Sequence, residues 1–205
     1  MHRQGDSTGQ CNTPLGLEGK SIPDSDITAS SQFNEYHVPS LCRLNTVNVG
    51  DLVGAWAARY KIPGEWIQIN LRKITMVTAI ATQGRYDLSQ WVTSYKICYG
   101  QKLDGFCEPL DKTFLGNTNR NTLVTHTFTT PIYARFVRIF PLTWVLYNSM
   151  RLELYGCKEG FTPVPGPVCM ESLGMETGKI PDSDITASSF WGSTFNFAPQ
   201  MSRFG

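Results

Sequence analysis

An internal repeat constrains this chain more than any other feature of its sequence. Residues 11–31 read CNTPLGLEGKSIPDSDITASS, and residues 169–189 read CMESLGMETGKIPDSDITASS, at a constant offset of 158 residues. Fourteen of these 21 positions are identical, and the run IPDSDITASS is repeated unchanged. A repeating unit of this size is longer than a solenoid repeat and typical of a whole domain. The sequence therefore predicts one complete domain, residues 11–157, followed by the truncated start of a second copy, residues 169–205.

The segments outside the two copies differ from the domain in composition. Residues 1–10 are polar, which predicts a disordered tail, and residues 158–168 hold three prolines, which predicts a semi-rigid linker. The N-terminal residues lack the apolar stretch of a signal peptide. We therefore expect a fragment of a longer protein. The second copy lacks the strands that would cover its opening segment, so we do not expect it to fold alone.

The charge of the chain is nearly balanced, and this balance excludes several classes of partner. It carries 18 basic and 17 acidic residues, for a formal net charge of +1. No block of basic residues breaks this balance, so neither a nucleic acid nor a polybasic membrane tether is expected. No run approaches the roughly 20 apolar residues of a membrane-spanning helix.

Short stretches with strand character recur along the whole domain. Ile67, Ile69 and Leu71 alternate with polar residues, which is the period of a half-buried strand. Turn-forming residues separate these stretches, and no window favours a long helix. We therefore predict an all-β antiparallel sandwich or barrel. The expected strands are residues 67–71, 77–82, 91–99, 125–128, 135–140 and 150–155, and the tryptophans expected to pack in the core are Trp56, Trp66, Trp91 and Trp144.

Six cysteines favour an extracellular disulfide framework. They form no CxxC pair and have no histidine cluster beside them, which argues against a zinc site. Cys98 and Cys107 are nine residues apart, a spacing suited to a bond across a hairpin or loop. Cys42 has no evident partner, and we interpret it as a small buried free thiol, with a disulfide to another cysteine as the alternative.

Seven blocks in order across the domain resemble the discoidin family, also called the coagulation factor V/VIII C-type domain. The blocks are IPDSDITASS (22–31), GAW (54–56), GEWIQINL (64–71), ATQGR (81–85), WVTSYKICY (91–99), PIYARFVRIFPLTW (131–144) and MRLELYGC (150–157). The resemblance implies an eight-stranded antiparallel, jelly-roll-like β-sandwich of the galactose-binding-like kind. It also implies that a Cys11–Cys157 disulfide ties the ends of the domain and that function lies in loops at one end.

The loops that match the functional loops of the family are residues 32–37, 86–90 and 116–121. Their side chains are expected to bind the ligand, although packing between loops and turn formation remain alternatives for them. The candidate ligand-binding residues are Gln32, Phe33, Asn34, Tyr36, Tyr86, Asp87, Leu88, Asn117, Asn119, Arg120 and Asn121. The family often has aspartate where this chain has Asn70 and Asn119, so no metal ion or other cofactor is expected. Cys42 stands where the family usually has alanine or serine.

The residues that could carry catalysis are better explained without it. His37 is the one histidine predicted to lie in a domain loop, and Glu35 is near it in sequence, but a solvated loop pair is the simpler interpretation. Asp24 and Asp26 flank Ser25 beside Pro23, where capping and turn formation are expected. We therefore do not expect an enzyme.

The sequence favours an extracellular adhesive module that recognises a cell-surface or matrix glycan or glycoprotein. Amide and arginine donors beside aromatic rings suit sugar hydroxyls and apolar sugar faces. The alternatives are binding to an anionic phospholipid membrane and a targeting domain of a secreted enzyme. A second discoidin-type domain in cis is the expected neighbour. After the shared IPDSDITASS run the copies diverge into QFNEYH and FWGSTF, which is typical of ligand-specific loops on one scaffold.

Overall fold

The computed structural model describes residues 11–102 and 107–157. The expectations for the tail at 1–10, the linker at 158–168 and the second copy at 169–205 lie outside the described residues. The described part contains nine strands, joined in one curled antiparallel sheet, and two short 3-10 helices. The elements are β1 (Thr13–Pro14), η1 (Asp24–Asp26), β2 (Ile27–Ala29), η2 (Pro39–Cys42), β3 (Trp56–Ala57), β4 (Ile67–Gln83), β5 (Trp91–Gly100), β6 (Glu108–Pro109), β7 (Phe114–Leu115), β8 (Val124–Val145) and β9 (Ser149–Cys157).

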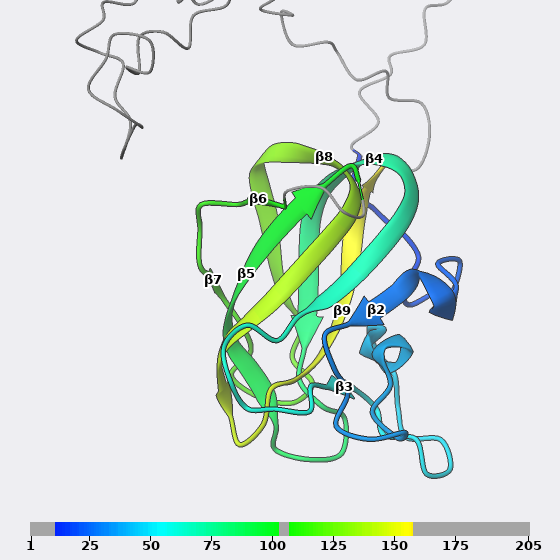
Figure 1. Cartoon of the computed structure of the whole chain (residues 1–205), viewed down its shortest axis with the longest axis vertical. Coiled ribbons are helices and arrows are strands. Elements are labelled where there is room, and N and C mark those ends of the chain that lie inside the picture. Colours follow the sequence, from blue (N-terminus) through cyan, green and yellow to red (C-terminus); the bar gives the residue numbers. More distant parts are fainter. Residues whose placement is uncertain (1–10, 103–106, 158–205) are drawn as a thin grey trace, which may run out of the picture. The chain divides into compact units, whose positions relative to one another are not determined.

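Two long strands, β4 and β8, build both layers of the domain. Residues 67–69 of β4 lie between β2 and the 137–139 part of β8, whereas residues 79–82 lie between β9 and the 124–127 part of β8. Figure 1 shows both strands bending over at the top of the view, where they pass from one layer to the other. The β5 strand then pairs with the second half of β8, from Phe136 to Val145. The predicted all-β antiparallel fold is confirmed.

The strand boundaries from sequence divide each of these long strands in two. The predicted strands 67–71 and 77–82 are both parts of β4, and 125–128 and 135–140 are both parts of β8. Register shifts between Asn70 and Thr75, and between Val77 and Ala79, mark the interruptions. A bulge breaks the local alternation of side chains but leaves the hydrogen-bonded ladder continuous on either side. Local periodicity therefore underestimates the length of both strands.

The core lies between the two layers and is formed by the inward positions of the strands. Ile67, Ile69 and Tyr95 are fully buried, as the alternation predicts. Trp56 is also fully buried, but Trp66, Trp91 and Trp144 are only half-buried, so the core assignment was wrong for these three. Trp66 precedes an inward-facing isoleucine and therefore points outward, where the guanidinium carbon of Arg138 lies 4.1 Å from its ring centroid.

Both predicted disulfides are present. Cys11 and Cys157 join the ends of the domain with their Cα atoms 4.9 Å apart, and Cys98 and Cys107 close a short loop with a Cα–Cα distance of 5.4 Å. Cys42 is a buried free thiol, as expected, and burial raises its pKa. We call the end of the sandwich that holds Cys11 and Cys157 the disulfide end.

Buried ionic groups attach the N-terminal segment to the sheet. The carboxylate of Glu153 is fully buried and accepts hydrogen bonds from the backbone N–H groups of Gly16, Leu17 and Glu18. Arg43 donates to the carbonyl oxygens of Leu17 and Ile22 at 2.7 and 2.8 Å and pairs with Asp24. These bonds give the turn before β2 a fixed position on β9.

The expected turn at Asp24 and Asp26 is present as η1, but their expected capping role is wrong. The 3-10 helix η1 begins after Pro23 and has no side-chain cap, and its two aspartates instead form ion pairs. Asp24 pairs with Arg43, and Asp26 pairs with Arg72. Sequence reasoning missed these pairs because both arginines are distant in sequence and reach the turn only in the folded domain.

Candidate functional site

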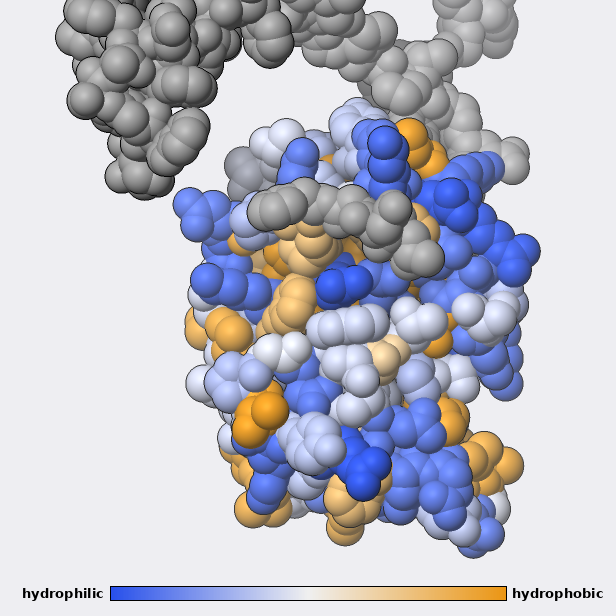
Figure 2. Space-filling view, viewed as in Figure 1, coloured by the Kyte–Doolittle hydropathy of each residue, from blue (hydrophilic) through white to orange (hydrophobic). Residues whose placement is uncertain are grey.

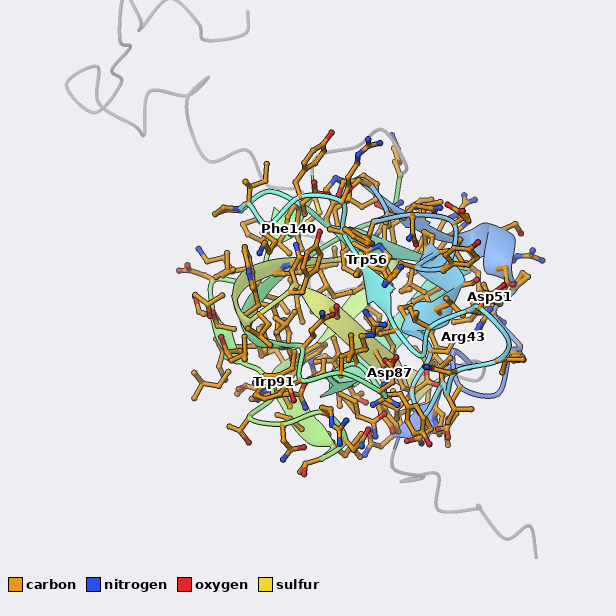
Figure 3. The ribbon with its side chains drawn as sticks, turned by 90° about the horizontal axis from the view of Figure 1, so that it is seen from below. Arg43, Asp51, Trp56, Asp87, Trp91 and Phe140 are labelled. Carbon is orange, nitrogen blue, oxygen red and sulfur yellow. A yellow bond between two sulfur atoms is a disulfide. The ribbon has the colours of Figure 1, made fainter. Side chains whose placement is uncertain are left out.

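Five loop segments meet at the end of the sandwich opposite the disulfide end, and we call this region the loop end. The segments are residues 32–37, 46–54, 84–90, 116–123 and 145–148. Backbone hydrogen bonds join them, including Val53 N–H to the Tyr36 carbonyl at 3.1 Å and Tyr86 N–H to the Gly54 carbonyl at 3.3 Å. Figure 3 looks onto this end and shows Asp51 and Asp87 on separate parts of it. Residues 46–54 and 145–148 were not among the predicted binding loops.

Arg151 on β9 holds three of these segments together. Its side chain is buried, and its guanidinium donates to the carbonyl oxygens of Gly84 at 2.6 Å, Thr46 at 2.9 Å and Arg120 at 2.9 Å. It also donates to the Asn121 Oδ1 atom at 2.8 Å. Burial lowers the pKa of Arg151 to about 10. The sequence contains a signal for this role, namely an arginine between apolar residues in a predicted strand, but sequence reasoning treated the block as framework.

A second polar cluster links the 32–37 and 84–90 segments. His37 is buried, and its Nε2 atom lies 3.1 Å from Arg85 while its Nδ1 atom lies 2.6 Å from Asn34 Oδ1. Because arginine can only donate, His37 Nε2 must accept, so His37 is neutral with its proton on Nδ1. Burial and the Arg85 charge lower the pKa of His37 to about 4.

Asp87 completes this cluster by pairing with Arg85 at 2.6 Å. Burial works to raise the pKa of Asp87, but hydrogen bonds from Arg85 and Asn48 outweigh it and hold the pKa at about 2. The Asn48 Nδ2 atom donates to Asp87 at 2.9 Å, and this bond connects the cluster to the 46–54 segment. The predicted site residues Asn34 and Asp87 thus hold the loops in place through these internal bonds.

The polar residues of the 116–123 segment are largely engaged within the protein. Asn117 is buried and donates to the carbonyl oxygens of Thr82 and Thr122, so its predicted place on the ligand-reading surface is corrected. Asn119 Oδ1 accepts from the backbone N–H groups of Asn121 and Thr122, which is turn geometry. Arg120 donates to the Asp87 carbonyl at 3.0 Å but remains exposed.

Apolar side chains, by contrast, are exposed on all five segments, and Leu123 of the 116–123 segment is 47% exposed. The 46–54 segment forms a tight hairpin in which Val49 and Leu52 exchange two backbone hydrogen bonds across Gly50, whose φ of 58° suits the turn. Figure 1 shows this cyan hairpin protruding at the lower right. The exposed apolar and aromatic residues of the other four segments, with their exposed fractions, are Phe33 (48%), Tyr36 (38%), Val47 (45%), Val49 (66%), Leu52 (39%), Tyr86 (43%), Leu88 (47%) and Leu146 (68%). We call these eight residues the apolar tips.

Two cavities border the loop end: one of about 290 Å³ beside the 46–54 segment, lined in part by Val47, Val49 and Leu52, and a smaller one between the 32–37 and 84–90 segments. The smaller cavity has a volume of about 50 Å³ and lies between Phe33, His37, Arg85, Gln90 and Tyr147, with Ala57 at its wall. Phe33 packs edge-on against Tyr147, with ring centroids 5.4 Å apart. A water molecule takes up about 30 Å³ in the liquid, so this space suits one or two waters rather than a sugar ring.

The remaining predicted site residue, Gln32, is half-buried and donates through Nε2 to the Asn34 carbonyl at 3.2 Å.

Among residues 11–102 and 107–157, no group of three or more histidine, cysteine, aspartate or glutamate side chains could hold a metal ion. None of the helices in this same part of the chain is long and apolar enough to cross a membrane.

Comparison with known proteins identifies the family. The family model of the F5/8 type C domain matches residues 26–154, which is more than half of the chain. The chain belongs to the discoidin, or F5/8 type C, family. The family resemblance seen in the sequence is therefore confirmed, and discoidin-type domains are carbohydrate- or phospholipid-binding modules.

Several curated proteins are similar to this discoidin chain. Human EGF-like repeat and discoidin I-like domain-containing protein 3 is 36% identical over 95% of this chain and 42% of its own length. Coagulation factor V of Mus musculus is 41% identical over 77% of this chain and 8% of its own length. Lactadherin of Sus scrofa is 34% identical over 94% of this chain and 49% of its own length. The chain thus spans less than half the length of these relatives, which are secreted or extracellular proteins and support an extracellular location.

A solved structure shows the same fold. Discoidin II of Dictyostelium discoideum matches with a TM-score of 0.63 and 29% identity, over 68% of this chain and 58% of that chain. Among less similar structures, a family 32 carbohydrate-binding module of C. perfringens NanJ, solved with galactose, matches with a TM-score of 0.52 and 23% identity over 65% of this chain. That level of identity supports the β-sandwich fold alone.

Proposed function

We propose that the loop end of this domain binds the surface of a phospholipid membrane through its apolar tips. The observation that carries this proposal is the exposure of eight apolar or aromatic side chains on neighbouring loops, with Val49 and Leu146 about two-thirds exposed. The sequence had favoured glycan recognition. The small cavity between the 32–37 and 84–90 segments and the internally bonded asparagines give little support to a sugar pocket at the predicted binding loops, whereas apolar loop tips suit the boundary between headgroups and acyl chains.

Charged groups at the loop end bear on the depth of binding and on the lipid preferred. Arg120 is exposed on the rim, and Lys61 lies with its Nζ atom 5.5 Å from the ring centroid of Tyr147. Glu35 and Asp51 are exposed among the apolar tips. The cations favour anionic lipid headgroups, and the two carboxylates oppose deep burial. We therefore expect binding confined to the interfacial layer.

The free energy that the 46–54 hairpin contributes to membrane binding can be worked out from its two exposed apolar side chains. Full burial of a valine or leucine side chain contributes about 1.5–3 kcal/mol, and Val49 and Leu52 have roughly half of this still to gain because they are 66% and 39% exposed. Replacing both by serine should remove about 2 kcal/mol of membrane binding, or roughly 30-fold in affinity.

Sedimentation of the full chain with lipid vesicles tests this proposal. Vesicles of phosphatidylcholine alone are compared with vesicles that also contain phosphatidylserine, and stronger binding to the anionic vesicles is expected. The Val49→Ser/Leu52→Ser variant should lose binding, and so should Phe33→Ser/Tyr36→Ser. Ile74→Ser is the matched control because Ile74 is also apolar and 41% exposed but lies at the bend of β4, away from the loop end.

Two results would overturn the proposal. One is the absence of binding to both kinds of vesicle, and the other is an equal loss of binding in Ile74→Ser and in the hairpin variant. A glycan array with the same proteins addresses the alternative function. Glycan binding that Phe33→Ser/Tyr36→Ser abolishes, without vesicle binding, would establish carbohydrate recognition at the loop end instead.

A further inference from the structure

Another cavity lies near the disulfide end, away from the loop end. It has a volume of about 260 Å³ and is placed beside the bend of β4 between Asn70 and Thr75. Eight residues of extended strand separate Thr75 from Gln83 at the loop end, a distance of roughly 25 Å. Figure 2 shows hydrophilic surface over this region, at the upper right of the view. One wall is apolar and is formed by Leu15, Ile22, Pro23 and Leu71.

Basic side chains gather at the mouth of this cavity. Arg72 lines it and is 66% exposed, while its Nε–H is bonded to Asp26, whose side chain is only 10% exposed. The carboxylate thus holds the guanidinium from the protein side and leaves its outer edge facing solvent. Lys73 also lines the cavity. Arg135 reaches the edge of the cavity through Asn70, which lines it, with the Arg135 Nε atom 3.4 Å from Asn70 Oδ1.

Asn70 sets the charge balance of this cluster. Its Oδ1 atom accepts from the Arg72 backbone N–H at 2.9 Å and approaches Arg135, while its Nδ2 atom donates to Asp26 at 3.1 Å. An aspartate at this position would add a second carboxylate between the two arginines. With asparagine, Asp26 is the sole carboxylate among the described residues that line the cavity, while Arg72 and Arg135 both hydrogen-bond to Asn70.

The backbone of Arg72 is strained. Arg72 has φ of 65°, in the left-handed region that residues other than glycine seldom adopt. The strain coincides with the register shift between Asn70 and Thr75, where β4 has four residues opposite one residue of β8. Bulges re-aim side chains, and strained residues concentrate at ligand sites. Here the bulge and the strain present Arg72 and Lys73 to the cavity.

We propose that this cavity binds a small organic anion that carries a sulfate or phosphate group, such as a sulfated monosaccharide. The guanidinium of Arg72, with Arg135 beside it, would bind the oxyanion by charge-assisted hydrogen bonds. The apolar wall would contact the rest of the ligand. Pockets for drug-sized ligands run from roughly 300 to 1,000 Å³, so this slightly smaller cavity suits a ligand of monosaccharide size.

Titration of the full chain, followed by amide NMR spectra, tests the site. The probes are N-acetylglucosamine 6-sulfate, neutral N-acetylglucosamine, inorganic sulfate and inorganic phosphate, each at constant ionic strength. Saturable shifts at residues 70–75 are expected with the sulfated sugar and not with the neutral sugar. Arg72→Gln and Arg135→Gln should each weaken binding about tenfold, because each removes a charge-assisted hydrogen bond. Arg138→Gln is the matched control, since Arg138 lies further along β8 over Trp66.

The outcomes separate the possibilities. Equal affinity for inorganic sulfate or phosphate and for the sulfated sugar would keep the oxyanion site and identify the free ion as its ligand. Absence of saturable shifts with every anion would overturn the proposal, as would an equal loss in Arg138→Gln. Because the variants are on separate strands, Arg135→Gln provides the test if Arg72→Gln fails to fold. The inference does not depend on membrane binding at the loop end.

Discussion

Replacing Arg151 by methionine should destabilise the domain and loosen the loop end selectively. Methionine keeps much of the side-chain length but removes every donor to Gly84, Thr46, Arg120 and Asn121. Each hydrogen bond from a charged donor contributes about 1.5–3 kcal/mol, so the four bonds together are large on the scale of a single substitution. Burial of the charge, seen in a pKa lowered to about 10, offsets part of this gain. We expect a net loss of about 3–5 kcal/mol.

Two measurements on the full chain check this expectation. Urea denaturation gives the loss of stability, which corresponds to a lower melting temperature by roughly 10 °C for a domain of this size. Amide hydrogen exchange shows where the loss occurs, and amides of residues 46–48, 84–86 and 120–122 should lose more protection than those of β4 and β5. Arg151→Lys should be intermediate, because an ammonium group can reach fewer of the four acceptors.

Arg138→Met is the control for this substitution. Arg138 is half-buried on the outer face of β8 and donates only to Gln68 Oε1 among the hydrogen bonds seen here, so we expect a loss below about 1 kcal/mol. If Arg151→Met is no more destabilising than Arg138→Met, Arg151 does not hold the loops. A uniform loss of protection across the domain would also refute the reasoning, since it would indicate a general role in the core.

The remaining predictions concern pH and the disulfides. The pKa of His37 falls from 6.5 in the unfolded chain to about 4 in the folded domain, so the unfolded chain binds the extra proton and stability is lost as pH falls from about 6.5 to 4. His37→Gln should flatten that part of a stability–pH curve by about 2–3 kcal/mol, and an unchanged slope would show that His37 titrates normally. Replacing Cys11 and Cys157 by serine should lower the unfolding free energy by about 5 kcal/mol, against about 3 kcal/mol for Cys98 and Cys107, because the longer bond closes a loop of 146 residues and the shorter one a loop of nine. Urea denaturation measures both costs, and the reverse order would contradict the loop-length argument.

Sequence alone determined the family, the fold class and the disulfide framework. The repeat places a cysteine at the start of each copy, Cys11 in the first and Cys169 in the second. The alternation around Ile67 and Ile69 identifies an inward face that the structure confirms. These features are local or recur in order along the chain, so they can be read without coordinates. The same reasoning assigned Trp66, Trp91 and Trp144 to the core, but they are only half-buried. An aromatic side chain in a strand can point either into the core or toward solvent, and its type alone does not show which.

Tertiary structure decided which loops meet and which side chains remain exposed among them. Val49 and Leu52 lie in a stretch that carries no binding motif, and they become tips only because the hairpin protrudes beside residues 32–37 and 84–90. Asn117 lies in a polar loop of the kind expected to contact a ligand, yet its side-chain amide donates to the carbonyl oxygens of Thr82 and Thr122. Hydrogen bonds between residues distant in sequence determine these outcomes, and the local pattern of a sequence carries no information about which distant groups will satisfy them.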